Sequence, residues 1–360
     1  MFKKIAIASA TVFLAFALYL LLWPTPVDPV AWEPPAAPTL EGVYASNNIL
    51  SDVQVIPIDG TIGHGPEDVA VDASGYIYAG LHEGRIVKIS PDLKSQEIFA
   101  DTSGRPLGLH FDLEGNLIVA DSYKGLLSVN PDGLITVLAT EANGLPFKFT
   151  DDVDIAANGV IYFTDASHKF GQADYKKDAI EHRPNGRLLA WLPQEKRVEV
   201  LLDNLYFANG VAVSPDQQFV LVNETWAYRI VKYWIAGDRA GQHEVLIDNL
   251  PGFPDGVSSN GDGVFWVALA SPRDPLLDQL GPRPFVRKII ARLPEFLQPS
   301  AIPFAFVLGI DGQGQVTHNL QQPDGTPFRF ITSVQREEEW LYLGSLEMPS
   351  LGRISLSKVD

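Results

Sequence analysis

VDIAANGVIYFTD, residues 153 to 165, has the pattern of a β-hairpin. Apolar residues alternate with polar ones, an Asn-Gly turn follows at Asn158 and Gly159, and a second apolar run returns. The chain contains six such hairpins, which are VAVDASGYIYAG from Val69, LHFDLEGNLIVAD from Leu109, VDIAANGVIYFTD from Val153, VAVSPDQQFVLVNE from Val211, VSSNGDGVFWVALA from Val257 and VQREEEWLYLGSL from Val334. A pattern repeated in this way indicates one repeating structural unit.

Each hairpin is followed by further apolar runs. The third strands are expected in GRIVKIS from Gly84, GLLSVN from Gly125, GRLLAW from Gly186, YRIVKYWI from Tyr228, PFAFVLGI from Pro303 and GRISLS from Gly352, and fourth strands in segments such as SQEIFA and VEVLLD. Four strands in each of six units predict an all-β fold, a six-bladed β-propeller. Longer gaps after the third and fifth hairpins predict insertions at residues 166–185 and 271–302.

The composition is that of a globular protein, with 46% hydrophobic and 20% charged residues in a chain of 360. We therefore expect the propeller to occupy residues 42–360 as one domain. A formal net charge of -17 argues against nucleic-acid partners and favours cationic ones. The chain has no Cys, which excludes disulfides, zinc-thiolate sites and thiol nucleophiles.

The N-terminus reads as a membrane segment. Ile5 to Trp23 is apolar and uncharged, it follows Lys3 and Lys4, and about 20 such residues span a bilayer as a helix. No small-x-small cleavage site ends the run, so residues 1–23 are predicted to be an uncleaved anchor; a cleaved signal is the alternative. The two lysines place the N-terminus in the cytoplasm and the propeller on the exported side. The Pro-rich residues 24–41 predict an extended stalk.

The position two residues before each hairpin carries the strongest functional signal. In chain order it holds Glu67, Leu107, Asp151, Asn209, Asp255 and Thr332. If the repeats close into a ring, these positions meet at its axis and bring three carboxylates and one amide oxygen together. Such a set would repel itself unless a cation were bound, and all-oxygen ligation favours Ca²⁺ over Mg²⁺ or Zn²⁺. For any single residue of the set, a turn is an equally good explanation.

Other side chains near this register are candidates for chemistry. Asp68 and Asp152 follow the predicted ligands by one residue, so strand alternation turns them away from the cation and suits them to orient ligands or transfer protons. His64, His110 or His182 could instead be a general base, although a lone His is more often structural.

The second insertion contains a basic amphipathic segment. Apolar residues between Pro284 and Leu297 fall on one helical face, with Arg283, Arg287, Lys288 and Arg292 beside them. Three placements are open: packing on a blade, docking on an anionic membrane surface, or lying as a lid over the pore.

Several segments resemble the strictosidine synthase-like family, and in particular its membrane-anchored branch. They are YFTDAS from Tyr162, FANGVAVSPD from Phe207, NLPGFPDGV from Asn249, RPFVRKII from Arg283 and LYLGSL from Leu341. The likeness covers roughly residues 59–356 together with the N-terminal anchor. The register is more distantly similar to that of SMP-30/gluconolactonase proteins, paraoxonases and diisopropyl fluorophosphatase, which are six-bladed propellers with calcium at the pore.

This resemblance implies that Glu67, Asp151, Asn209 and Asp255 are calcium ligands; many relatives have Asn where Asp151 stands. The catalytic His of paraoxonases would fall at Leu107, and the Glu of true strictosidine synthases near Thr332. The His-dependent mechanism of paraoxonases and the alkaloid-forming condensation of strictosidine synthases are therefore both disfavoured.

What remains is a Ca²⁺-dependent hydrolase of esters, lactones or phosphotriesters, of the lactonase or arylesterase type. Asp255 is the first choice for the carboxylate that activates water or attacks the substrate, and Asp152 and Asp68 are its helpers. The alternative from another class is a membrane-tethered binding module in which Ca²⁺ is structural.

Overall fold

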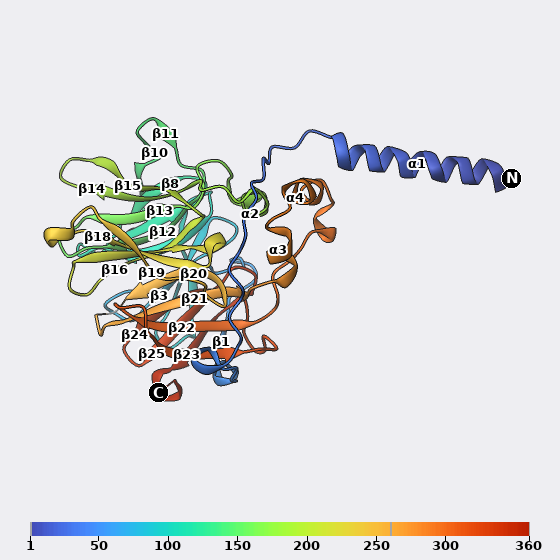
Figure 1. Cartoon of the computed structure of the whole chain (residues 1–360). Helices are drawn as coiled ribbons and strands as arrows, with labels where there is room; N and C mark the ends of the chain where they lie inside the picture. The colour runs from blue at the N-terminus through green and yellow to red at the C-terminus, as the bar shows by residue number, and fades with distance from the viewer. Residues whose placement is uncertain (1, 260, 360) are drawn as a thin grey trace.

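The computed structural model describes residues 2–259 and 261–359, and in these ranges the predicted six-bladed β-propeller is confirmed. Six four-stranded antiparallel sheets are arranged around one axis (Figure 1). The first strand of each hairpin is the innermost, and neighbouring innermost strands contact one another around the ring.

Five blades follow chain order from the axis outward. The first contains β2 (Val69–Val71), β3 (Ile77–Gly80), β4 (Arg85–Ile89) and β5 (Gln96–Asp101). The second contains β6 (Pro106–Phe111), β7 (Leu117–Asp121), β8 (Gly125–Val129) and β9 (Ile135–Ala139). The third contains β12 (Thr150–Ile155), β13 (Ile161–Asp165), β14 (Gly186–Leu192) and β15 (Arg197–Leu205). The fourth contains β16 (Ala208–Val213), β17 (Phe219–Glu224), β18 (Arg229–Trp234) and β19 (His243–Ile247). The fifth contains β20 (Gly252–Ser259), β21 (Val264–Pro272), β22 (Ala305–Asp311) and β23 (Val316–Gln322).

The sixth blade closes the ring with a strand from the other end of the domain. Its C-terminal strands are β24 (Ile331–Glu337), β25 (Trp340–Ser345) and β26 (Ser350–Ser355), and its outermost strand is β1 (Gln54–Pro57). β1 pairs antiparallel with β26, from Gln54 opposite Arg353 to Pro57 opposite Ser350. Backbone hydrogen bonds therefore join the two ends of the propeller, which the hairpin pattern alone does not indicate.

Apolar side chains fill the space between adjacent blades. Phe219 of the fourth blade and Phe265 of the fifth lie with ring centroids 5.8 Å apart, and Phe306 belongs to the same buried cluster. A second small hairpin, β10 (Glu141–Ala142) with β11 (Leu145–Pro146), extends from the second blade. Short 3₁₀ helices complete the fold; they are η1 (Gly42–Tyr44), η2 (Ile49–Asp52), η4 (Thr225–Ala227), η5 (Gly237–Arg239) and η7 (Leu356–Lys358).

The two predicted insertions form helices on one side of the ring. The first folds into η3 (Gln172–Asp174) and α2 (Tyr175–Glu181), and the second into α3 (Pro275–Leu280), α4 (Pro284–Ile290) and η6 (Glu295–Leu297). α4 contacts both α2 and α3, so the insertions make one structure, here called the lid. The helix expected from Pro284 to Leu297 is shorter than predicted because Pro294 cannot continue it.

The N-terminal helix α1 (Phe2–Leu22) has no buried residue and is long and apolar enough to cross a membrane. It projects from the side of the propeller that carries α2, α3 and α4 (Figure 1). Residues 24–41 contain no helix or strand, as expected for an extended segment. They are held to the lid, however, because Val30 N donates to Glu181 O and Trp32 N donates to Gly281 O.

Glycine residues let the innermost strands approach one another closely. A Cβ atom at Gly210 would lie 2.4 Å from Val257 N in the next blade, and one at Gly108 would lie 2.6 Å from Asp152 Cα. A Cβ atom at Gly256 would likewise lie 2.6 Å from Thr332 O in the sixth blade. These contacts leave no space for a side chain, so the tightness of the ring depends on glycine here.

We predict that Gly210→Ala destabilises the propeller by about 1–3 kcal/mol, because the added methyl group forces two blades apart. Gly60→Ala is the matched control, since its Cβ would meet nothing within 4 Å. Denaturant unfolding of both variants measures the difference. Equal stability of the two variants would show that the strands are not packed as tightly as described.

Candidate functional site

The six register positions meet at one mouth of the propeller, as the sequence predicts. All of them line a single cavity of about 810 Å³; they are Glu67, Leu107, Asp151, Asn209, Asp255 and Thr332. Glu67, Asp151 and Asn209 are buried at its floor, and Asp255 is partly exposed there. The ring closure thus converts a spacing in the sequence into one oxygen-lined site.

Local breaks in strand pairing position these side chains. In the second to sixth blades the pairing of the innermost strand shifts across the register position, for example between Thr150 and Val153 and between Ala208 and Val211. Such a β-bulge redirects side chains that regular alternation would send elsewhere. In the sequence these bulges coincide with two consecutive polar or glycine residues that interrupt the alternation of the strand, such as Asp151-Asp152 and Asn209-Gly210.

Buried polar side chains hold the backbone at the same positions. The Thr332 hydroxyl donates to Glu67 O at 2.7 Å, and the Thr164 hydroxyl donates to Asn209 O at 2.7 Å. Asn223 Nδ2 donates to Asp255 O at 2.5 Å. Thr332, the sixth register position, therefore positions the main chain of Glu67.

The three carboxylates disfavour one another's ionisation. Burial, followed by the charges of Asp255 and Asp151, raises the pKa of Glu67 well above its usual range. Burial and then Asp255 raise the pKa of Asp151 in the same way. Burial also raises the pKa of Asp255 to about 7, against a hydrogen bond from the Asn209 side chain that lowers it. The floor of the cavity thus brings together carboxyl groups whose ionised forms are disfavoured unless a positive charge lies near them.

One buried arginine, which the sequence did not single out, offsets part of this charge. Arg105 is fully buried, donates to Gly65 O at 2.9 Å, and lowers the pKa values of Glu67 and Asp151. Its signal in the sequence was a lone basic residue two positions before Leu107. The guanidinium group of Arg105 therefore already places one positive charge near these carboxyl groups.

The donor set fits a hard cation in chemistry. Asp151 Oδ2 is buried, and in the described part of the chain it has no hydrogen-bond partner. Three carboxylates and the Asn209 amide supply only oxygen, the donor that Ca²⁺ prefers. Among residues 2–259 and 261–359, no three His, Cys, Asp or Glu side chains are closed into a ready metal-binding group. The side chains that would hold such a cation all line the cavity; they are Glu67, Asp151, Asn209 and Asp255.

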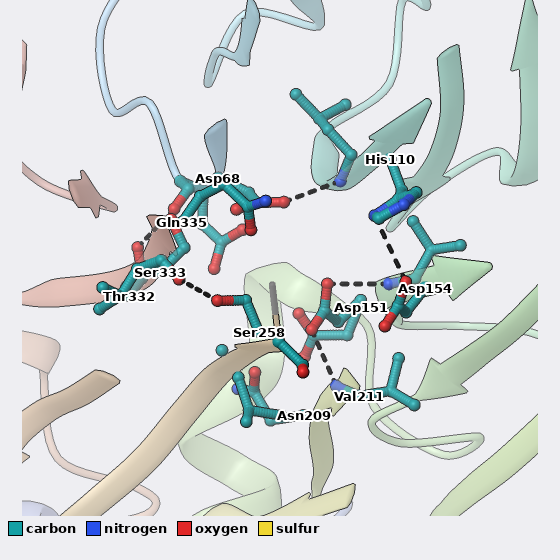
Figure 2. Close-up of a pocket in the computed structure, with 18 residues that line it drawn as sticks. Asp68, His110, Asp151, Asp154, Asn209, Val211, Ser258, Thr332, Ser333 and Gln335 are labelled. Carbon is teal, nitrogen blue, oxygen red and sulfur yellow. Dashed lines mark hydrogen bonds and ion pairs between the residues drawn. The ribbon is translucent and has the colours of Figure 1, made fainter. Parts of the chain in front are cut away.

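Asp68 and Asp152 face away from the cavity, as alternation predicts. They line a channel of about 30 Å³ below it, into which Glu67, Asp151 and Asn209 also reach (Figure 2). Asp68 Oδ2 accepts from Leu109 N at 2.9 Å and Asp152 Oδ2 accepts from Val211 N at 2.8 Å, each across to the next blade. Both carboxylates therefore bind backbone of neighbouring innermost strands.

The three candidate histidines lie in different places. His110 borders the channel, with Nδ1 3.4 Å from Asp154 Oδ1 (Figure 2). His182 stacks on Trp32 at 4.0 Å between centroids, and burial lowers its pKa to about 3. His64 lines the cavity and holds Glu83 Oε1 at 2.6 Å from Nδ1. Of the three, His64 alone combines access to the cavity with a carboxylate partner.

Aromatic and aliphatic side chains form the walls of the cavity above its polar floor. They include Phe149, Phe207, Trp226, Tyr228, Phe253 and Phe330 from the propeller and Leu277, Leu280 and Ile290 from the lid. Trp32 of the N-terminal segment also lines it. The site is therefore a roofed apolar space over a small polar floor, a shape typical of small-molecule sites.

The fold and this floor define a six-bladed propeller with a cavity at one mouth. Family models described as strictosidine synthase and as strictosidine synthase-like, N-terminal, match residues 151–238 and 42–89. The chain is 37% identical to strictosidine synthase-like protein 10 of Arabidopsis thaliana, over 87% of this chain and 92% of that protein. It is 32% identical to rat adipocyte plasma membrane-associated protein, over 94% of this chain and 96% of that protein. The chain belongs to the strictosidine synthase-like family.

Solved structures share the fold at low sequence identity. A gluconolactonase from Xanthomonas campestris has a TM-score of 0.62 and 16% identity, covering 93% of this chain and 99% of that one. A calcium-binding regucalcin from Agrobacterium tumefaciens has a TM-score of 0.59 and 15% identity, covering 83% and 92%. The apolar helix and the membrane-associated relative together support membrane association of this chain.

We predict that Thr332→Val destabilises the protein by about 1–3 kcal/mol, because Glu67 O loses its buried donor. Thr332→Ser keeps the hydroxyl and is expected to lie much closer to the parent. Thermal unfolding of the three proteins provides the measurement. A valine variant as stable as the serine variant would remove Thr332 from the role of positioning Glu67.

Proposed function

We propose that the protein is a Ca²⁺-dependent hydrolase of esters, lactones or phosphotriesters, with Glu67, Asp151, Asn209 and Asp255 as the metal ligands. The observation that carries the proposal is the floor of the cavity, which Glu67, Asp151 and Asp255 all line and where the buried Asp151 Oδ2 lacks a partner among the described residues. Membership of a propeller family whose fold is shared by a gluconolactonase supports the reaction class.

Each part of the site has a place in this chemistry. Ca²⁺ would supply Lewis-acid polarisation of the carbonyl or phosphoryl oxygen. Asp255, partly exposed to the cavity and hydrogen-bonded by the Asn209 side chain, takes a proton from water as the water oxygen attacks the acyl carbon or phosphorus. Asp255 then gives this proton to the leaving oxygen as its bond to the acyl carbon or phosphorus breaks, which yields an acid and an alcohol and returns Asp255 to the ionised form.

The surrounding residues prepare the substrate and the ligands. The aromatic walls exclude water and suit an apolar acyl or aryl group. Asp68 and Asp152 assist Asp255 as positioning residues, because their bonds to Leu109 N and Val211 N fix the strands that carry the floor. Lys3 and Lys4 in the first turn of α1 favour a cytoplasmic N-terminus and an exported propeller.

A membrane-tethered binding module is the second candidate. It is favoured by the fact that two of the three carboxylates considered for catalysis, Asp68 and Asp152, line the channel and not the cavity. In that case Ca²⁺ would only join the blades and the cavity would hold a ligand without turnover.

Ca²⁺ is predicted to stabilise the full-length protein by about 2.7 kcal/mol at a hundredfold excess over its Kd, and Mg²⁺ to do much less. Asp151→Ala should weaken Ca²⁺ binding more than about tenfold, because loss of a residue that only hydrogen-bonds a metal ligand already lowers metal affinity by about that factor. Calorimetry gives both numbers. Glu114→Ala, at an exposed hairpin turn, is the matched control. Equal Ca²⁺ affinity in all three proteins would exclude the assigned site.

Hydrolysis of a panel of lactones, aryl esters and phosphotriesters should depend on Ca²⁺ and fall about 10²–10⁴-fold in Asp255→Ala, which lacks the proposed base. Initial rates with and without chelator measure this, again beside Glu114→Ala. Activity that survives both the chelator and the substitution rules out the hydrolase mechanism. Strong stabilisation by Ca²⁺ without turnover of any substrate would establish the binding module instead.

A further inference from the structure

The lid exposes large apolar side chains. Phe285 is 62% exposed, Phe296 83% and Leu297 54%, and Val286 of α4 and Leu276 of α3 are exposed as well. These five residues are here called the lid surface. Phenylalanine and leucine are costly to leave in water, and a group of them on one structure marks an interaction site.

Hydrogen bonds join this lid to the end of the membrane helix. Arg292 Nε donates to Trp23 O at 2.6 Å and Arg292 Nη1 donates to Leu20 O at 3.0 Å. In return the Tyr19 hydroxyl donates to Arg292 O at 3.0 Å. Arg292 lies two residues after the end of α4 and is itself buried, so the last turn of α1 and the lid form one connected structure.

The N-terminal segment strengthens this connection. Arg287 of α4 donates to Val30 O and, at 2.9 Å, to Ile180 O of α2. Asp28 N donates to Glu181 Oε2 at 2.8 Å, at the end of the same helix. The chain that leaves α1 is therefore bonded to both insertions and does not separate the lid from the membrane as a free stalk would.

Charge on the lid differs from charge on the rest of the chain. Residues 283–292 contain four basic side chains and no acidic one, in a protein of net charge -17. Arg283 is exposed and Lys288 is half-buried. Basic residues beside exposed aromatic and aliphatic ones are the composition that binds anionic lipid surfaces.

We propose that the lid surface docks into the bilayer that α1 enters, so that the roof of the cavity lies against lipid. Two observations select the bilayer over a second copy or another protein. The lid is bonded to the residues at which α1 ends, Leu20 and Trp23, and aromatic side chains at a helix end favour the lipid interface. The positive charge of Arg283 and Lys288 also matches anionic lipid headgroups. The rest of a second copy is acidic, and an acidic surface is a poorer partner for these apolar side chains than lipid.

The proposal is independent of hydrolysis, because it concerns only how the propeller sits on the membrane. It implies that α1 stands across the bilayer while α3, α4 and η6 lie in the interface, consistent with their common side of the ring (Figure 1). Ligands dissolved in the lipid would then reach the cavity through the lid without crossing water.

The absence of Cys from the chain allows a direct test. Phe285→Cys and Phe296→Cys are labelled with a bimane fluorophore in the full-length protein, reconstituted in phosphatidylcholine vesicles that contain phosphatidylglycerol. Leu113→Cys is the control, since Leu113 is 90% exposed at the hairpin turn at the opposite end of β6 from the cavity. Quenching by brominated lipid and by aqueous iodide is compared.

We expect the labels at 285 and 296 to lie roughly 5–10 Å into the headgroup boundary, with quenching by brominated lipid and protection from iodide. The label at 113 should show the reverse. Arg283→Glu combined with Lys288→Glu should reduce lipid quenching in anionic vesicles and leave it unchanged in neutral ones. Iodide access at 285 and 296 equal to that at 113 overturns the proposal. Protection from both quenchers also overturns it, because a protein would then cover the surface.

Discussion

The close convergence of six innermost strands on one axis is the constraint on which the rest of this structure depends. Neighbouring backbones approach so closely that a Cβ at Gly210 or Gly256 would lie 2.4 Å from Val257 N or 2.6 Å from Thr332 O. Where the strands meet, each position must be a glycine or must carry a side chain that a β-bulge turns toward one mouth of the ring. The same geometry that closes the ring therefore creates its polar centre.

Carboxylates that are adjacent in sequence have different positions in this ring. Glu67 and Asp151 reach the floor of the cavity, whereas Asp68 and Asp152 turn into the channel and accept backbone N–H groups of the next blade. The second set thereby binds the strands that carry the first. Carboxylates brought together in this way repel one another, and a nearby positive charge offsets the repulsion; Arg105 supplies one such charge.

The roof of the cavity depends on contacts between segments distant in the chain. Trp32 from the N-terminal segment stacks on His182 from the first insertion, and Arg287 from the second insertion bonds Val30. The membrane helix, the extended segment and both insertions thus form one structure above the mouth. The roof of the cavity is therefore bonded both to the N-terminal segment and, through Arg292, to the end of α1.

Much of the fold follows from local pattern, because hairpin periodicity and turn residues depend on neighbours in sequence. The repeated hairpins predicted six blades, and the spacing of Glu67, Asp151, Asn209 and Asp255 predicted that their side chains share one site. The apolar run before Trp23 predicted α1. Local pattern could not identify β1 as the strand that completes the sixth blade, since its partner lies about 300 residues away and pairing over that distance leaves no local signal. Nor could it reveal that the segment thought to be a stalk is bonded to the lid, or that Arg105 lies beside the carboxylates. Those features arise only when ring closure brings remote backbone and charge into contact, which is a property of the folded chain.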